Sequence, residues 1–234
     1  KCEIYTDVEG IFTADPRVTK KAKLLKEITY DEMLEMASTG ARVLMARSVE
    51  FGRRYNVPII VRPTFSEGTG TIVKERVMEQ AIVSGVTHND KEIKFTLFGV
   101  PDQPGIAGSV FGHLSEKGVN VDMIVQNVSK DAKTDISFTA PEEQKEEVVK
   151  ILSILTEDLN AEGSDTDENI ARVSIIGAGM KSESGVASKM FKILGANEVN
   201  IGMISTSPIR ISCVISKDDM QKAIEVLHDE FIVD

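Results

Sequence analysis

Residues 104–129 read PGIAGSVFGHLSEKGVNVDMIVQNVS, and residues 184–209 read SGVASKMFKILGANEVNIGMISTSPI. The two stretches share Gly, Ala, Phe and Leu in their first halves and Val, Asn, Met and Ile in their second halves. Matching positions such as Gly105 and Gly185 are 80 residues apart (185 − 105). Self-similarity of this extent is typical of a domain that occurs twice. Most of the chain is therefore predicted to be a paired module.

Each copy has the pattern strand, helix, strand, strand, helix, which is the core of the ferredoxin-like βαββαβ sandwich. In the first copy, Asp102 and Pro104 are predicted to open the first helix and Gly118 to close it. The second helix has an acidic face and an inward apolar stripe of Val148, Ile151, Leu152 and Leu155. The second copy is predicted to have its strands at 171–179, 199–206 and 209–216 and its helices at 184–196 and 218–231.

The second copy lacks a convincing fourth strand of its own. A strand predicted at 82–87 could fill that place, which would insert the first module into the second. The first module would then close with residues in 158–168, although NAEGSDTDE has weak strand character. The predicted domains are 1–75, 82–169 (with strand 82–87 donated to the second module) and 170–234.

Residues 1–73 have a different pattern, which is typical of an α/β layer. CEIYT (2–6) and NVPIIVRP (56–63) are predicted strands, and the glycine-rich loop SEGTGT follows the second of them. Thr29 and Glu32 form a capping-box pattern at the start of a helix. A second helix is predicted at 42–55, with Leu44, Phe51 and Tyr55 on one face. Residues 74–80 are predicted to be a connector.

The composition excludes several classes of function. The chain has 234 residues, 41% of them hydrophobic, and a formal charge of −10, which argues against a nucleic-acid-binding face. No apolar run approaches membrane-spanning length. Cys2 and Cys213 are too far apart in sequence to suggest a disulfide framework, so a cytoplasmic location is expected. His88, His113 and His228 are too scattered for a metal site. The start at Lys1, without a signal pattern, suggests the later part of a longer protein.

The loops that open the repeated helices are candidate binding sites, because a helix N-terminus offers unpaired N–H groups to a carboxylate or phosphate. Gly105 and Gly185 would let a ligand approach the backbone closely. Asp102 has two interpretations: it caps the helix, or it accepts a ligand's ammonium group. Asn120 and Asn200 either end a turn or contact the same ligand. The residues alone leave both questions open.

The chain resembles a known family in CEIYTDVEGIFTADPR, EMASTGARVLMARSVEFGRRYNVPIIVR, VPDQPGIAGSVF, VDMIVQNVS, TDISFT and GAGMKSESGVASKMF. Both copies resemble ACT domains, and residues 1–73 resemble the end of the aspartate kinase catalytic domain. The resemblance implies α/β and α+β folds: the end of an amino-acid-kinase domain followed by two ferredoxin-like ACT domains. It also implies phosphorylation of the aspartate β-carboxylate by ATP with Mg²⁺, feedback inhibition by lysine, threonine or both, and a homo-oligomer formed by ACT pairing.

The resemblance also implies site residues. Nucleotide-contacting positions fall on Thr6, Asp7, Phe12, Thr13, Ala14, Asp15, Pro16, Arg17, Arg42 and Val43. Effector positions fall on Asp102, Gly105, Ile106, Ala107, Val119, Asn120, Val121 and Gln126 in the first module and on Val186, Ala187, Asn200, Ile201, Ser207 and Pro208 in the second. Ser129 and Thr134 neighbour the first set.

Two departures from the family's pattern matter. Lys181 stands where the first module has Asp102, so a ligand ammonium group is favoured only in the first loop. The family's glycine-rich KFGGTS-like motif, with its catalytic lysine, does not occur, so no catalytic residue is assigned. The alternatives are a non-catalytic regulatory subunit, which senses amino acids and supports assembly, and an amino-acid sensor fused to a different kinase-like enzyme.

Overall fold

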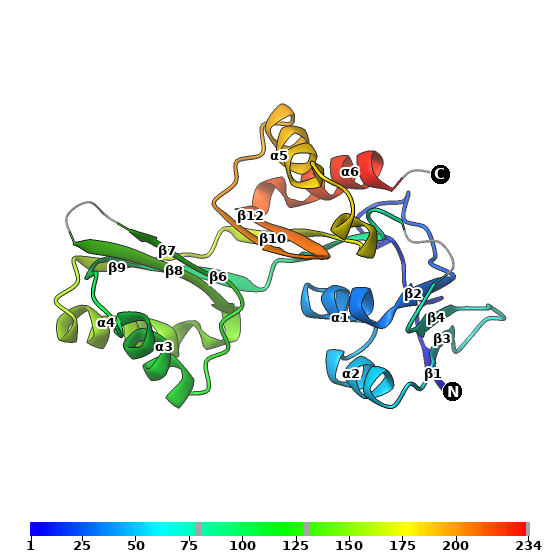
Figure 1. The fold of residues 1–234 in the computed structure, drawn as a ribbon, viewed down its shortest axis with the longest axis horizontal. Coiled ribbons are helices and arrows are strands. Elements are labelled where there is room, and N and C mark those ends of the chain that lie inside the picture. The colour runs from blue at the N-terminus through cyan, green and yellow to red at the C-terminus, as the bar shows by residue number, and fades with distance from the viewer. Residues whose placement is uncertain (78–80, 129–131, 233–234) are drawn as a thin grey trace. The chain divides into compact units, whose positions relative to one another are not determined.

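The chain divides into two units, Lys1–Asn89 with Arg172–Asp234 and Asp90–Ala171 (Figure 1). The structure is a computed structural model, and it describes residues 1–77, 81–128 and 132–232. Among these residues, no helix combines the length and apolarity needed to cross a membrane.

The unit Asp90–Ala171 is an antiparallel sheet with two helices on one face (Figure 1). Its strands are β6 (Glu92–Pro101), β7 (Ile124–Val128), β8 (Lys133–Pro141) and β9 (Gly163–Asp167), in the order β7-β8-β6-β9. The helices are α3 (Ile106–Glu116) and α4 (Lys145–Asp158), and the 3₁₀ turn Glu142–Gln144 precedes α4. The predicted apolar stripe of α4 is buried, as expected for a helix that covers a sheet. The closing strand β9 is polar because its side chains lie at the sheet edge, half-buried or exposed.

The second module has the same topology within the larger unit. Its strands are β5 (Gly85–Asn89), β10 (Ile170–Ile176), β11 (Met203–Ser207) and β12 (Arg210–Ser216), in the order β11-β12-β10-β5. β5 runs antiparallel to β10, with His88 opposite Val173, in the place that β9 holds in the other sheet. The helices α5 (Val186–Ala196) and α6 (Met220–Phe231) supply apolar side chains to its core.

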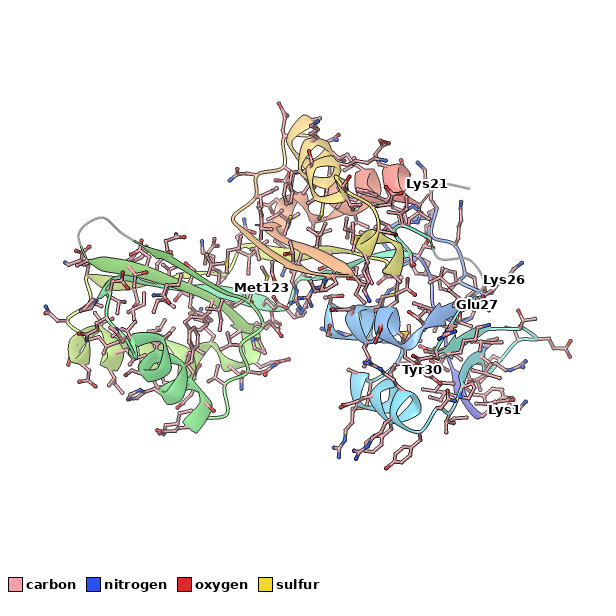
Figure 2. The ribbon with its side chains drawn as sticks, in the orientation of Figure 1. Lys1, Lys21, Lys26, Glu27, Tyr30 and Met123 are labelled. Atoms are coloured by element: carbon pink, nitrogen blue, oxygen red, sulfur yellow. The ribbon has the colours of Figure 1, made fainter. Side chains whose placement is uncertain are left out.

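The N-terminal segment forms a third sheet, which has the order β1-β3-β4-β2. Its elements are β1 (Cys2–Thr6), β2 (Glu27–Thr29), α1 (Tyr30–Ser38), α2 (Ala46–Arg54), β3 (Ile59–Pro63) and β4 (Thr71–Lys74). β1 and β3 are parallel, which is typical of an α/β layer. The predicted capping box is confirmed, because the Thr29 and Glu32 side chains each accept a hydrogen bond from the other's backbone N–H. Tyr30, labelled in Figure 2, is 1% exposed at the start of α1.

The second helix differs from the prediction in where it starts and in which residues it buries. Helix α2 starts at Ala46 instead of residue 42, and its buried residues are Val49 and Gly52. Phe51 and Tyr55 are 47% and 64% exposed and stack on each other with ring centroids 6.2 Å apart. The inward face is set by Gly52, where an added Cβ would lie 2.8 Å from Ile59 Cδ1.

The short strands β2 and β4 were not anticipated from the sequence. β4 begins at Thr71, within the predicted glycine-rich loop, and ends at Lys74, where the connector was predicted to start. β2 is held by pairing with β4, which is distant in sequence, whereas β4 also pairs with β3 across the short loop between residues 63 and 71. Residues 78–80 of the predicted connector lie outside the described residues.

Candidate functional site

Thr6 and Asp7 lie at the carboxyl end of β1. Thr6 O accepts a hydrogen bond of 2.8 Å from Thr64 N, so the chain leaving β3 lies beside them. Thr6 Oγ1 donates to Asp7 Oδ1 at 3.0 Å, and the Asp7 side chain is exposed. Ligands of α/β sheets bind at the carboxyl ends of parallel strands. Thr6 and Asp7 lie at such an end, because β1 and β3 are parallel.

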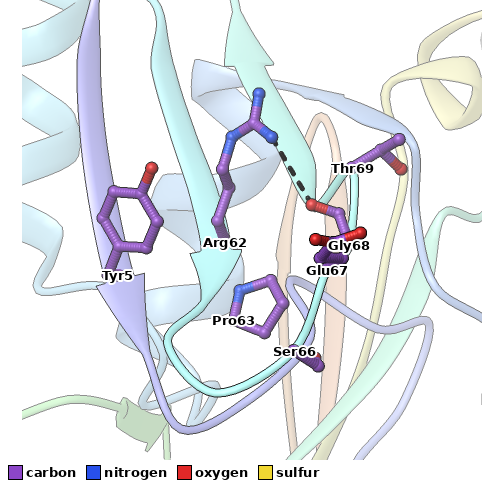
Figure 3. Close-up of a pocket in the computed structure, with 7 residues that line it drawn as sticks. All are labelled: Tyr5, Arg62, Pro63, Ser66, Glu67, Gly68 and Thr69. Carbon is purple, nitrogen blue, oxygen red and sulfur yellow. Dashed lines mark hydrogen bonds between the residues drawn. The ribbon is translucent and has the colours of Figure 1, made fainter.

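A hollow of about 380 Å³ opens at the same edge (Figure 3). It is lined by Tyr5, Arg62, Pro63, Ser66, Glu67, Gly68 and Thr69. Arg62 reaches across it, with Nη1 3.5 Å from Gly68 O. None of the predicted nucleotide residues lines this hollow. The signal that could have found it is the SEGTGT loop directly after a buried strand, because glycine-rich loops at such places often receive phosphates.

The segment from Phe12 to Arg17 divides into a buried and an exposed part. Thr13 and Ala14 are each 5% exposed, and Ala14 belongs to the apolar core of the second module. Asp15 accepts bonds from Arg17 N at 2.8 Å, Arg17 Nε at 3.0 Å and Arg17 Nη2 at 2.7 Å. These bonds, above all those from the Arg17 side chain, lower the pKa of Asp15. The same contact raises the pKa of Arg17. Pro16 and the Arg17 side chain are exposed, the latter at 89%.

Arg42 and Val43 lie in the loop between α1 and α2. Arg42 is exposed, whereas Val43 is half-buried against the core of the N-terminal sheet. Of the ten predicted nucleotide residues, Thr6, Asp7, Asp15, Arg17 and Arg42 therefore offer polar side chains outside the core. Phe12 is half-buried and pairs with Leu24 through an isolated β-bridge.

The two repeated helices begin in the same unusual way. Gly105 and Gly185 are their N-cap residues, with φ of 94° and 90°, and neither helix has a side-chain cap. Residues other than glycine rarely adopt this left-handed backbone conformation. This explains why both copies have glycine at the position before the helix. The capping interpretation of Asp102 is wrong, because the exposed Asp102 lies three residues before the actual N-cap.

The predicted effector residues of the first module do not meet at one point. Gly105 precedes α3 and the exposed Asn120 follows it, so a helix of 11 residues, about 16 Å long, separates them. Ile106 and Val119 are core residues, and their backbone N–H groups donate to Gln103 O and Leu114 O. Ala107 and Val121 are half-buried, and Gln126 is exposed on β7. Thr134 is buried and donates from Oγ1 to Asn127 O, and Ser129 lies outside the described residues.

The corresponding loop of the second module is already engaged by the N-terminal segment. It forms a 3₁₀ turn, Ala178–Lys181, and Ala178 N donates to Glu32 Oε1 at 2.9 Å. Ser207 Oγ donates to Glu35 Oε1 at 3.1 Å, and the Arg210 guanidinium lies 2.9 Å from Glu35 Oε2. The sequence did not anticipate Glu32 or Glu35 as partners of this loop and hairpin.

The other predicted effector residues of the second module differ in exposure. Val186 is a core residue, and Ala187 and Ile201 pack against the core. Asn200, Pro208 and Lys181 are exposed. Within the described ranges, no group of three His, Cys, Asp or Glu residues could hold a metal ion.

The lowered pKa of His228 is expected to make the stability of the fold depend on pH. Burial lowers the pKa of His228 from its ordinary value of 6.5; Lys23 and Lys21 add to the effect and Asp229 opposes it. The unfolded chain therefore takes up a proton at higher pH than the folded chain, and the free energy of unfolding falls as pH drops below 6.5. Urea unfolding at about pH 7.5 and about pH 5.5 measures this slope. A His228→Gln variant with an unchanged slope would contradict the assignment.

Two known families match parts of the chain. The ACT domain family matches residues 96–153 and 173–231, and the amino acid kinase family matches residues 1–63. The fold and these matches define the end of an amino acid kinase domain joined to two ACT domains.

Similar proteins narrow this class. The aspartate kinase Ask_LysC of Stutzerimonas stutzeri is 46% identical over the whole chain, which spans 58% of that protein. The ligand-free regulatory subunit of aspartate kinase from Thermus thermophilus is 35% identical, with a TM-score of 0.61, over 64% of this chain and 99% of that one. E. coli aspartokinase III with lysine and aspartate is 25% identical, with a TM-score of 0.81, over 99% of this chain and 52% of that one; it is also known with aspartate and ADP. The chain belongs to the aspartate kinase family.

Proposed function

We propose that this chain is the end of the catalytic domain and the regulatory region of an aspartate kinase. The complete enzyme would phosphorylate the β-carboxylate of aspartate with ATP, as the first step toward lysine, threonine and methionine. The observation that carries this proposal is the alignment with aspartate kinases over the whole chain, including both ACT modules and the nucleotide segment. Structures of E. coli aspartokinase III with ADP and with lysine support the choice of nucleotide and effector.

Three of the predicted nucleotide residues have side chains that suit a nucleotide. Arg42 and Arg17 carry exposed positive charge for phosphate oxygens, and Asp7 is an exposed carboxylate. Magnesium in such sites is held by one or two carboxylates together with the phosphates, a role that Asp7 could fill. Phosphoryl transfer itself needs the glycine-rich and lysine-bearing parts that this chain does not contain.

The effector is proposed to bind between modules of two copies of the chain. Because α3 separates the Gly105 loop from Asn120 within one module, a single small ligand could contact both kinds of residue only where a second copy supplies one of them. Ile124 on β7 and Ile204 on β11 are 53% and 43% exposed at matching places of the two sheets. Apolar side chains on edge strands favour pairing of the modules and thus a homo-oligomer. Lysine is the first candidate effector and threonine the second.

The domain boundaries are proposed as 1–75, 82–169 and 170–234, with β5 contributed to the last domain. The chain is proposed to work in the cytoplasm, which the free cysteines Cys2 and Cys213 support.

Replacement of Asp102 tests the effector assignment. In the complete enzyme, Asp102→Asn is expected to weaken lysine binding about tenfold, because a neutral amide attracts an ammonium group less strongly than a carboxylate. Isothermal titration calorimetry measures the affinity. Lys181→Ala serves as the matched control in the second loop and should leave lysine affinity within about twofold. No heat with lysine, threonine or their mixture in the unaltered enzyme would contradict the sensor function.

A non-catalytic regulatory subunit is the second candidate. The regulatory subunit from Thermus thermophilus, of which this chain covers 99%, favours it. Purification of the protein from its source, followed by an assay of aspartate phosphorylation, distinguishes a complete aspartate kinase from a separate regulatory subunit. A polypeptide that begins near Lys1 and lacks activity alone would favour the subunit.

A further inference from the structure

The segment 12–17 is attached to the second ACT module at three points. Thr13 O accepts a hydrogen bond of 2.7 Å from Val86 N at β5. Thr13 Oγ1 lies 2.8 Å from Nε2 of His228, in the last turns of α6. Ala14 is part of the module's apolar core. The module therefore holds residues 13 and 14 by backbone, side chain and packing, and exposed Arg17 follows within four residues.

The contact between Thr13 and His228 is buried and specific. Thr13 is 5% exposed and His228 is 2% exposed, so water cannot replace either partner at low cost. Thr13 Oγ1 also accepts a bond of 2.9 Å from Lys23 N. The hydroxyl proton is thus available for Nε2 of a neutral His228. The Thr13 hydroxyl therefore accepts a hydrogen bond from the Lys23 backbone and also donates one to His228 of α6.

The exposed residues next to Thr13 depend on this anchor. Asp15 and Arg17 bond mainly to each other, and the Asp15 backbone carbonyl accepts from Val18 N at 3.0 Å. These bonds lie within residues 15–18, so they shape the segment without fixing where it lies. Thr13 and Ala14 join the segment to the second module, and Val18, just after it, packs against the same core.

We propose that His228 is a positioning residue for nucleotide binding: by holding Thr13, it fixes the Asp15–Arg17 part of the nucleotide site to α6 of the second ACT module. The inference rests on the proposed nucleotide role of residues 12–17. It makes α6 a direct mechanical link between the second module and ATP affinity, separate from the contacts of Glu32 and Glu35.

The test uses the complete aspartate kinase that contains this chain. His228→Leu removes the hydrogen bond, and the KM for ATP is expected to rise about five- to tenfold, with kcat and the KM for aspartate within about twofold. His228→Gln keeps an amide that can bond to Thr13 Oγ1 and should restore most of the ATP affinity. Glu225→Gln, at an exposed position of α6 where the Glu225 side chain accepts a hydrogen bond from Gln221 of the same helix, is the matched control and should leave both KM values unchanged.

Two further variants separate the possible failures. Arg17→Ala tests the nucleotide role itself and should raise the KM for ATP. If Arg17→Ala raises it and His228→Leu lowers only the melting temperature, the positioning role is wrong and the proposed function stands. If neither variant changes it, the nucleotide assignment of the segment is wrong. If His228→Leu does not fold, Thr13→Val removes the same bond from the other side, and an unchanged KM for ATP would overturn the proposal.

Discussion

Replacement of Gly40 by alanine is expected to lower the free energy of unfolding of the unit that contains it by roughly 3–5 kcal/mol. Gly40 follows α1 with φ of 124°, a conformation that costs other residues energy. An added Cβ would also lie 1.8 Å from His88 O, a backbone atom of β5 that cannot rotate away. The loss should combine backbone strain with forced separation of α1 from the second module.

Gly185→Ala is the matched control for Gly40→Ala. Gly185 also has a positive φ, of 90°, but an added Cβ would meet nothing within 4 Å. This variant should lose only the conformational part, about 1–2 kcal/mol. Urea unfolding measures both variants, and hydrogen exchange in α1 and β5 locates the damage. Equal losses in the two variants would show that the contact with His88 does not matter.

Replacement of Glu32 by alanine is expected to cost about 3–4 kcal/mol of unfolding free energy. The Glu32 side chain is 2% exposed and accepts four hydrogen bonds. Two come from Thr29, from N at 3.2 Å and from Oγ1 at 2.6 Å, and the others from Ser84 Oγ at 2.6 Å and Ala178 N at 2.9 Å. Alanine would leave these buried donors without an acceptor, and α1 would lose half of its capping box.

Asp31→Ala is the control for Glu32→Ala. The neighbouring Asp31 forms an ion pair of 2.9 Å with Arg53, and both side chains are about half exposed. Exposed pairs of this kind contribute about 0–1 kcal/mol, so the control should stay close to the unaltered chain. Urea unfolding monitored by circular dichroism compares the variants. A Glu32→Ala loss no larger than that of Asp31→Ala would refute the role of Glu32 in joining α1 to the second module.

Features with a local cause could be predicted from the sequence. The Thr29–Glu32 capping box and the apolar stripe of α4 each depend on residues a few positions apart, and the structure has both. The repeat could be recognised because the same residues recur 80 positions later. The outward face of α2 was missed, because Gly52 packs on β3 and has no side chain to mark the buried face. β4 was missed because it is short and begins at the end of a glycine-rich loop, and because one of its partners, β2, is distant in sequence.

The candidate sites show the same limit. A helix-opening glycine at 105 and 185 is visible in the sequence because it recurs. The burial of Thr13 is not visible, because its partner His228 is 215 residues away. Engagement of the Ala178 loop by Glu32 spans 146 residues and leaves no local pattern. Residues 6–17 and 102–126 could thus be assigned by resemblance, whereas their division into buried and available side chains needed the fold.

The pairing of β5 with β10 has a consequence for synthesis of the protein. β5 is made before residues 90–169, yet its partner strand begins only at Ile170, and β12 and α6 follow later still. Until then β5 is an unpaired strand edge, which is a site for aggregation. The first module can fold early on the ribosome because its contacts lie within Asp90–Ala171. The second must close a long loop and is expected to fold more slowly. Chaperones that shield a nascent strand edge should therefore matter most between translation of residue 89 and the last turn of α6.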